Sequence, residues 1–195
     1  MSADDLHQAH ILQPDSEPRK YMVCVDGSRC SSWAFNYCVR QMRVAIDELY
    51  LIAVADEIDT AAISAPYMNQ EFFEAAQKKE DEIAKQHLRP VWREAKRLNI
   101  VNRHVVLARG SDAGEAICSY AEKANIDTLF LGRRGLGTIK RLFLGSVSRH
   151  CIENATCNIV VVKHPEDPVR PHTAVAAKTD PHRVLSEEEL AADAQ

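Results

Sequence analysis

A glycine-rich, basic stretch with the sequence LFLGRRGLGTIKRLFLGS occupies residues 129–146. It holds four of the seven glycines in the chain and four basic residues, and it has no acidic residue. Glycines let backbone N–H groups approach an anion closely, because no β-carbon stands in the way. The stretch ends at Gly145-Ser146, where we expect a helix to begin, and free N–H groups and the helix dipole favour phosphate there. These features together predict a polyphosphate site.

The glycine spacing excludes two common phosphate loops. The Walker pattern G-x-x-x-x-G-K-[ST] does not occur, and Gly135-x-Gly137 does not continue into the dinucleotide pattern G-x-G-x-x-G. The spacing that does occur is Gly132-x2-Gly135-x9-Gly145-Ser146. Around these glycines, we expect the basic side chains Arg133, Arg134, Lys140 and Arg141 to contact phosphate.

The positive charge of this stretch is local. The whole chain has a net charge of −4 and a pI of about 6.1, so we expect no nucleic-acid partner. No segment approaches the ~18 apolar residues of a membrane span, and the first residues are acidic where a signal peptide would be basic. We therefore expect no membrane association and a cytoplasmic location.

The six cysteines give no metal-binding pattern. No C-x-x-C pair occurs, and each cysteine lies in an apolar or helical segment. Structural metal sites usually draw closely spaced ligand pairs from turns. We predict reduced cysteines that pack as small hydrophobic residues, and we assign no metal ligand and no catalytic residue.

Apolar runs alternate with helical patterns along most of the chain. Strands that are apolar throughout and alternate with helices are typical of a parallel sheet covered on both faces. The fold class predicted is α/β, a doubly wound five-stranded parallel sheet with helices on both faces. The predicted strands are 20–25, 47–58, 101–110, 126–132 and 158–163, and the predicted helices begin at Ser28, span 67–98 and 113–124, and begin near Ser146.

Local signals refine the helices. Ser28 should cap the first helix, and Asp112 and Glu115 form a plausible capping pair for the third. Pro90 should kink or split the second helix. We expect that helix to bury one apolar stripe, made of Phe72, Ala76, Ile83, Val91, Ala95 and Leu98.

The chain is predicted to contain one folded domain with two tails. Residues 1–18 are polar and are expected to form a disordered N-terminal lead, and residues 19–164 hold the folded domain with the predicted polyphosphate site. Residues 165–195 contain four prolines in their first part and supply no second core. They are expected to form a flexible tail.

The glycine spacing resembles the signature G-x2-G-x9-G-[ST] of the universal stress protein family, and the resemblance covers about residues 20–164. It implies a sheet order of 3-2-1-4-5 and binding of ATP, with or without Mg²⁺. One departure is Asn158 after Cys157, where the family usually has Cys-Pro.

The resemblance also implies a role for individual residues. Val25 and Asp26 should approach the adenosine, and Val54 should touch the adenine. The ribose and phosphates should be lined by Gly132, Arg134 and Gly135, and held from the helix N-terminus by Gly145, Ser146, Val147 and Ser148.

The last strand suggests a partner. In the order 3-2-1-4-5 it lies at an edge, and an apolar edge strand invites pairing with another chain. We expect a homodimer through Ile159–Val162, which is also the habit of the family. The alternative is an edge covered by the C-terminal tail.

Three functions remain open. The first is an ATP-binding stress-response protein that acts as a nucleotide-dependent sensor or switch. The second is a slow ATP phosphohydrolase, which would need a group to orient water and Mg²⁺, and for which Asp26 is the candidate acid. The third is an interaction protein with a vestigial nucleotide site.

Overall fold

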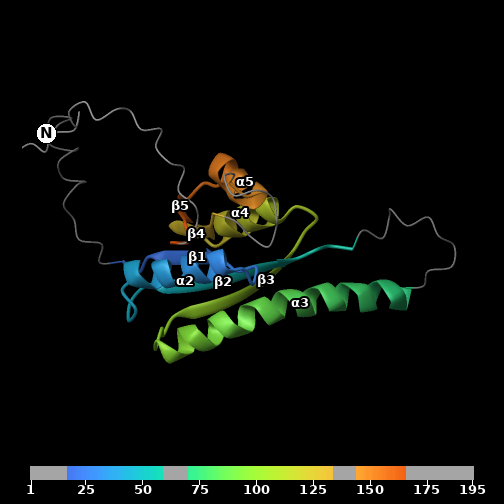
Figure 1. Ribbon diagram of the computed structural model, residues 1–195, viewed down its shortest axis with the longest axis horizontal. Helices are drawn as coiled ribbons and strands as arrows, with labels where there is room; N and C mark the ends of the chain where they lie inside the picture. Colours follow the sequence, from blue (N-terminus) through green and yellow to red (C-terminus); the bar gives the residue numbers. More distant parts are fainter. Residues whose placement is uncertain (1–16, 59–69, 134–143, 166–195) are drawn as a thin grey trace, which may run out of the picture.

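A computed structural model describes residues 17–58, 70–133 and 144–165 (Figure 1). It contains every helix and strand that the sequence predicts, with shorter strands in several cases. The strands are β1 (Lys20–Cys24), β2 (Glu48–Ala55), β3 (Arg103–Arg109), β4 (Thr128–Gly132) and β5 (Asn158–Val162). The helices are α2 (Arg29–Gln41), α3 (Gln70–Arg97), α4 (Ala113–Lys123) and α5 (Ser146–Asn154).

The five strands form one parallel sheet in the order β3-β2-β1-β4-β5. This confirms the predicted fold class and strand order. The winding direction reverses between β1 and β4, so the carboxyl ends of these two strands define the crevice where such sheets bind ligands. The glycine-rich stretch begins within β4, at Leu129, and continues past the carboxyl end of that strand.

Helices cover both faces of the sheet. On one face, α2 and α3 bury a cluster that includes Phe35, Leu88 and Phe130. On the other face, α4 and α5 bury a second cluster around Ile117 and Cys151. In Figure 1, α4 and α5 lie together on one side and α3 runs along the opposite side, reaching well beyond the strands. The sheet is therefore a rigid platform whose carboxyl edge is shaped by all four helices.

Two helix caps agree with the sequence. The Ser28 hydroxyl accepts a hydrogen bond from the Ser31 N–H at 3.1 Å, and α2 begins at the next residue. The Asp112 carboxylate accepts from the N–H groups of Gly114 and Glu115 at 2.7 and 3.1 Å. Each cap satisfies backbone donors that the first helical turn leaves free. Both residues are thereby confirmed as caps.

Pro90 does not split α3, because the helix runs unbroken over 28 residues. Proline removes one backbone donor and frees the carbonyl four residues earlier, here that of Gln86. Both Pro90 and Gln86 are exposed, so water can satisfy that carbonyl without unwinding the helix.

The predicted buried stripe of α3 is also partly wrong. Phe72 and Ile83 are 50% and 38% exposed. The buried positions are Asp81, Ala84, Leu88, Val91 and Ala95. An aspartate heads this stripe because Arg109 at the end of β3 donates to its carboxylate, at 3.0 Å from Nε and 2.6 Å from a terminal nitrogen. Hydrogen bonding from Arg109 lowers the pKa of Asp81 and keeps it ionised.

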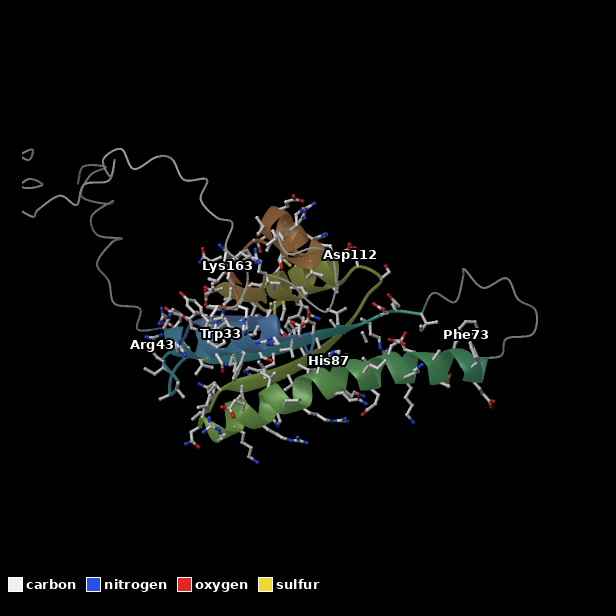
Figure 2. The ribbon with its side chains drawn as sticks, in the orientation of Figure 1. Trp33, Arg43, Phe73, His87, Asp112 and Lys163 are labelled. Carbon is white, nitrogen blue, oxygen red and sulfur yellow. The ribbon has the colours of Figure 1, made fainter. Side chains whose placement is uncertain are left out.

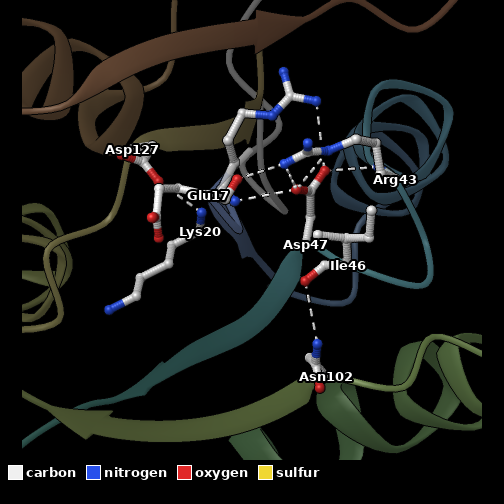
Figure 3. Close-up of polar contacts among 8 residues, drawn as sticks. Glu17, Lys20, Arg43, Ile46, Asp47, Asn102 and Asp127 are labelled. Carbon is white, nitrogen blue, oxygen red and sulfur yellow. Dashed lines mark hydrogen bonds and ion pairs between the residues drawn. The ribbon is translucent and has the colours of Figure 1, made fainter. Parts of the chain in front are cut away.

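Carboxylates close the amino edge of the sheet (Figure 3). The Asp47 carboxylate, which is fully buried, accepts hydrogen bonds from the backbone N–H groups of Arg19 and Arg43 and from the Arg43 guanidinium. The Asp127 carboxylate accepts from the Lys20 N–H at 2.7 Å. These bonds tie the starts of three strands together and leave the opposite edge as the place for a ligand.

The six cysteines are free thiols, as predicted. Cys24, Cys118, Cys151 and Cys157 all belong to the cluster under α4 and α5. Burial raises the pKa of each of these thiols, and that of Cys151 rises to about 12. Protonated thiols in an apolar cluster pack as small hydrophobic groups.

Candidate functional site

The turn after β1 forms the first wall of the crevice. Val25 is buried, and its N–H donates to the Ile52 carbonyl of β2 at 2.8 Å. The Asp26 carboxylate accepts from the Ser28 N–H at 3.0 Å. Gly27 between them has a φ of +78°, which glycine adopts without strain. A compact left-handed turn therefore presents Asp26 at the carboxyl end of β1.

Val54 lies on the neighbouring strand at the same edge. The register pairs Cys24 with Ile52, so Val54 extends two residues further toward the carboxyl end of β2. Val54 is half-buried and packs against the cluster on the α4 face. The structure thus brings Val54 to the same level of the sheet as Asp26.

The end of β4 is pressed against α2. A β-carbon placed on Gly132 would lie 2.7 Å from the carbonyl carbon and 2.8 Å from the β-carbon of Cys30. Contacts that short do not occur between real atoms, so only glycine fits here without movement of α2. Gly132 consequently joins the end of β4 to the first turn of α2.

The N-terminus of α5 forms the opposite wall. Gly145 is the N-cap and offers no side-chain hydrogen bond, whereas Ser28 and Asp112 cap α2 and α4 with their side chains. Ser146 is exposed and Val147 is half-buried. An N-terminus without a capping side chain can receive its hydrogen bonds from an anion.

Ser148 has a different position from its neighbours. It is 4% exposed, and its hydroxyl donates to the Gly132 carbonyl at 2.9 Å. The Gly145 N–H in turn donates to the Arg133 carbonyl at 3.0 Å. These two bonds fasten the start of α5 to the end of β4. The Ser148 hydroxyl therefore holds the site together in this structure.

Eight of the ten residues predicted for the site converge on this edge: Val25, Asp26, Val54, Gly132, Gly145, Ser146, Val147 and Ser148. The other two, Arg134 and Gly135, lie outside the described residues. The converging residues offer backbone donors, a helix N-terminus and one carboxylate. Such a set is suited to binding an anion beside a group that accepts or donates hydrogen bonds.

Sequence reasoning missed the contribution of α3 to this edge. The Gln77 side-chain amide donates to the Asp56 carbonyl at 3.0 Å, and its oxygen accepts from the Ile58 N–H at 3.0 Å. Further along α3, the imidazole of His87 lies against Gly27. A polar residue inside a long helix carries no signal of its own in a single sequence, and only the crossing of α3 over the sheet reveals these contacts.

Comparison with known proteins places this arrangement in a family. The model of the universal stress protein family matches residues 18–163. A putative universal stress protein of Staphylococcus haemolyticus is 26% identical over 151 residues, which cover 77% of this chain and 87% of the relative.

Solved structures share the fold. Universal stress protein UspA from Lactobacillus plantarum superposes with a TM-score of 0.62 at 22% identity, covering 76% of this chain and 99% of that one. An Arabidopsis thaliana family member with AMP bound gives a TM-score of 0.55 at 21% identity, with coverages of 77% and 94%. A universal stress protein in complex with cAMP gives 0.55 at 20% identity, with coverages of 75% and 98%.

The family model covers residues 18–163, a range that includes all five strands, β1 to β5. No helix among the described residues is long and apolar enough to cross a membrane. On this evidence, the chain belongs to the universal stress protein family.

Proposed function

We propose that this protein binds an adenine nucleotide, ATP in the first place, at the carboxyl edge of its sheet and acts as a nucleotide-dependent sensor or switch in the cytoplasm. The observation that carries the proposal is the N-terminus of α5, which has no capping side chain and is fastened to the end of β4 by Ser148. Family members of similar fold are described with AMP and with cAMP bound. All of these ligands share an adenosine and at least one phosphate.

The ligand is assigned an orientation across the crevice. Its phosphates lie at Gly145–Ser148, and we assign Gly132, Arg134 and Gly135 to contacts with the ribose and phosphates. Its adenosine lies at Val25 and Asp26, and its adenine reaches Val54. This orientation places negative charge at a helix N-terminus and an apolar ring beside apolar strand residues.

A sensor is favoured over a phosphohydrolase. Hydrolysis needs a group that orients water at the terminal phosphate, and usually Mg²⁺. Asp26 is the one carboxylate among the described residues assigned to the site, and one of its oxygens already accepts from the Ser28 N–H. It also lies at the adenosine end of the proposed ligand. Slow hydrolysis remains the second candidate, measured as phosphate release from ATP with Mg²⁺.

A homodimer is part of the proposal. β5 is an edge strand of the sheet and carries four consecutive apolar residues, Ile159–Val162. Pairing of two β5 strands would satisfy their free edges and bring two nucleotide sites into one molecule. A conformational change at the nucleotide site of one copy would then be transmitted to the second copy across the β5 pairing.

The direct test is thermal unfolding of nucleotide-free protein with ATP, ATP plus Mg²⁺, AMP or cAMP. A ligand at about one hundred times its dissociation constant adds roughly 2.7 kcal/mol of stability. For a domain of this size the melting temperature should rise by roughly 5–10 °C. If the melting temperature of nucleotide-free protein rises with none of the four ligands, the nucleotide site is vestigial, as the third hypothesis holds.

Ser146→Asp tests the placement of the phosphates. Ser146 is exposed in the first turn of α5, where an aspartate is favourable for the helix itself. The free protein should keep its melting temperature, whereas ATP binding should weaken by at least about tenfold because a carboxylate repels the phosphates. Ser119→Asp, on the exposed side of α4, adds the same charge away from the site and should leave binding unchanged. Equal affinity of both variants would refute the phosphate position.

A further inference from the structure

The helix α3 places one imidazole directly against the turn after β1. A β-carbon added to Gly27 would lie 2.5 Å from Cδ2, 2.9 Å from Nε2 and 3.1 Å from Cγ of His87. The ring therefore packs against the α-carbon of Gly27, and Figure 2 shows His87 on the side of α3 that faces the sheet. His87 is 60 residues away from this turn in the sequence.

This contact lies at the border of the buried face of α3. Ala84, Leu88 and Val91 around it are buried, whereas His87 is half-buried. The helix reaches beyond the strands (Figure 1), and His87 lies where α3 contacts the turn after β1. Its ring thus has one edge on the turn and access to solvent.

The ring nitrogens of His87 have no protein partner in the parts of the chain that the structure describes, since no hydrogen bond or ion pair involves them. Half-buried polar groups usually form hydrogen bonds to protein or to ordered water. A neutral imidazole offers one donor and one acceptor. Both are available next to the turn that carries Asp26.

We propose that His87 belongs to the nucleotide site and forms a hydrogen bond with a ribose hydroxyl of the ligand. The inference rests on the proposed function. The ribose is the chemical match because His87 contacts the turn at the adenosine end, while the phosphates lie at α5. A hydroxyl can accept from and donate to a neutral imidazole, so no charge on the ring is required.

Packing alone would be the other role for this ring. His87 would then only hold the Gly27 turn, and any flat side chain of similar size would serve. His87→Phe separates the two roles, because phenylalanine fills the same space and has no ring nitrogen. His104→Ala is the matched control, since His104 is a half-exposed histidine on β3 that stacks on Tyr50 outside the site.

The experiment measures dissociation constants of the full chain by calorimetry for AMP and ATP. A hydrogen bond contributes about 0.5–1.5 kcal/mol net, so His87→Ala and His87→Phe should each weaken binding about two- to twelvefold. The factor should be the same for AMP and ATP, because both contain the same adenosine. His104→Ala should bind as the wild type does.

Deoxynucleotides identify the contact. If His87 bonds to a ribose hydroxyl, then wild type and His87→Phe should bind equally to whichever of 2′-deoxy-ATP and 3′-deoxy-ATP lacks that hydroxyl. The inference is overturned if His87→Phe binds ATP as the wild type does, if its loss grows with the number of phosphates, or if it loses the same factor on both deoxynucleotides.

The outcome also separates this inference from the proposed function. Wild-type protein that binds neither AMP nor ATP would overturn both at once. Wild-type protein that binds both, with Ser146→Asp impaired and His87→Phe unimpaired, would leave the nucleotide site in place and remove His87 from it.

Discussion

The carboxylate of Asp47 is one of the two that link the strands at the amino edge of the sheet. It is fully buried and receives hydrogen bonds from the Arg19 and Arg43 N–H groups and the Arg43 guanidinium. Asp47→Ala should lower the free energy of unfolding at pH 7 by about 2–4 kcal/mol, because it leaves buried donors without an acceptor. Urea denaturation measures this, and a loss below 1 kcal/mol would mean that water replaces the carboxylate.

The same residue predicts an acid dependence. Burial by itself would raise the pKa of Asp47, but hydrogen bonds from Arg43 and Arg19 outweigh it and lower the pKa to about 2, from 3.8. A lowered pKa stabilises the folded state above the unfolded pKa, and this contribution is lost as the pH falls through the folded one. The stability gap between wild type and Asp47→Ala should therefore be constant above pH 5 and shrink between about pH 4 and 2. A difference in unfolding free energy that stays constant down to pH 2 would contradict the lowered pKa of Asp47.

At the scale of elements, Gly27 and His87 couple the turn after β1 to α3. Gly27→Ala meets two obstacles, the left-handed φ of +78° and the ring of His87 at 2.5 Å. Together they should cost about 3 kcal/mol of stability. His87→Ala removes the ring but leaves the left-handed φ of residue 27. Gly27→Ala should therefore cost about 1–2 kcal/mol of stability in a His87→Ala background.

A double-mutant cycle by urea denaturation gives the difference as a coupling energy. The four proteins of the cycle are the wild type, each single variant and the double variant. Additive losses would show that α3 yields to the new methyl group and that the turn and the helix are independent.

The elements also show what a sequence can and cannot reveal. Apolar runs and capping residues predicted all nine elements, because each run is long enough to be read locally. The predicted split at Pro90 does not occur because the Gln86 carbonyl is on an exposed face, and which face of α3 meets the sheet cannot be read locally. The predicted buried stripe of α3 was partly wrong because the buried Asp81 pairs with Arg109. Arg109 is 28 positions away, and such a pairing leaves no local pattern in the sequence.

The candidate site was predictable for a related reason. Its glycine and serine spacing is local, and the carboxyl ends of parallel strands meet at one edge whatever the side chains are. The residues that α3 contributes to this edge were not predicted. His87 lies at the border between the buried and exposed faces of the helix, where a histidine is common and gives no functional signal. Asp47 precedes β2 and gave no signal, because one of its partners, Arg19, lies 28 residues away in the sequence.

At the scale of the whole molecule, the sheet has two edges of different character. β3 carries Arg103 and Arg109, and charged residues discourage pairing at an edge. β5 has the sequence NIVVV, with no charge to protect it. Pairing between two copies is therefore expected through β5, as in the proposed homodimer, and the β3 edge should remain exposed.

Val161→Lys tests this asymmetry. Val161 is half-buried on β5, and a lysine there puts like charges face to face across a paired edge. At about 10 μM, light scattering on a sizing column should give twice the 21.9 kDa chain mass for the wild type and the single mass for the variant. Val105→Lys, at a 48% exposed position on the β3 edge, is the matched control and should remain dimeric. If Val105→Lys and not Val161→Lys produced monomers, the copies would pair through β3, and a wild type of single mass would mean that β5 pairs with no second copy.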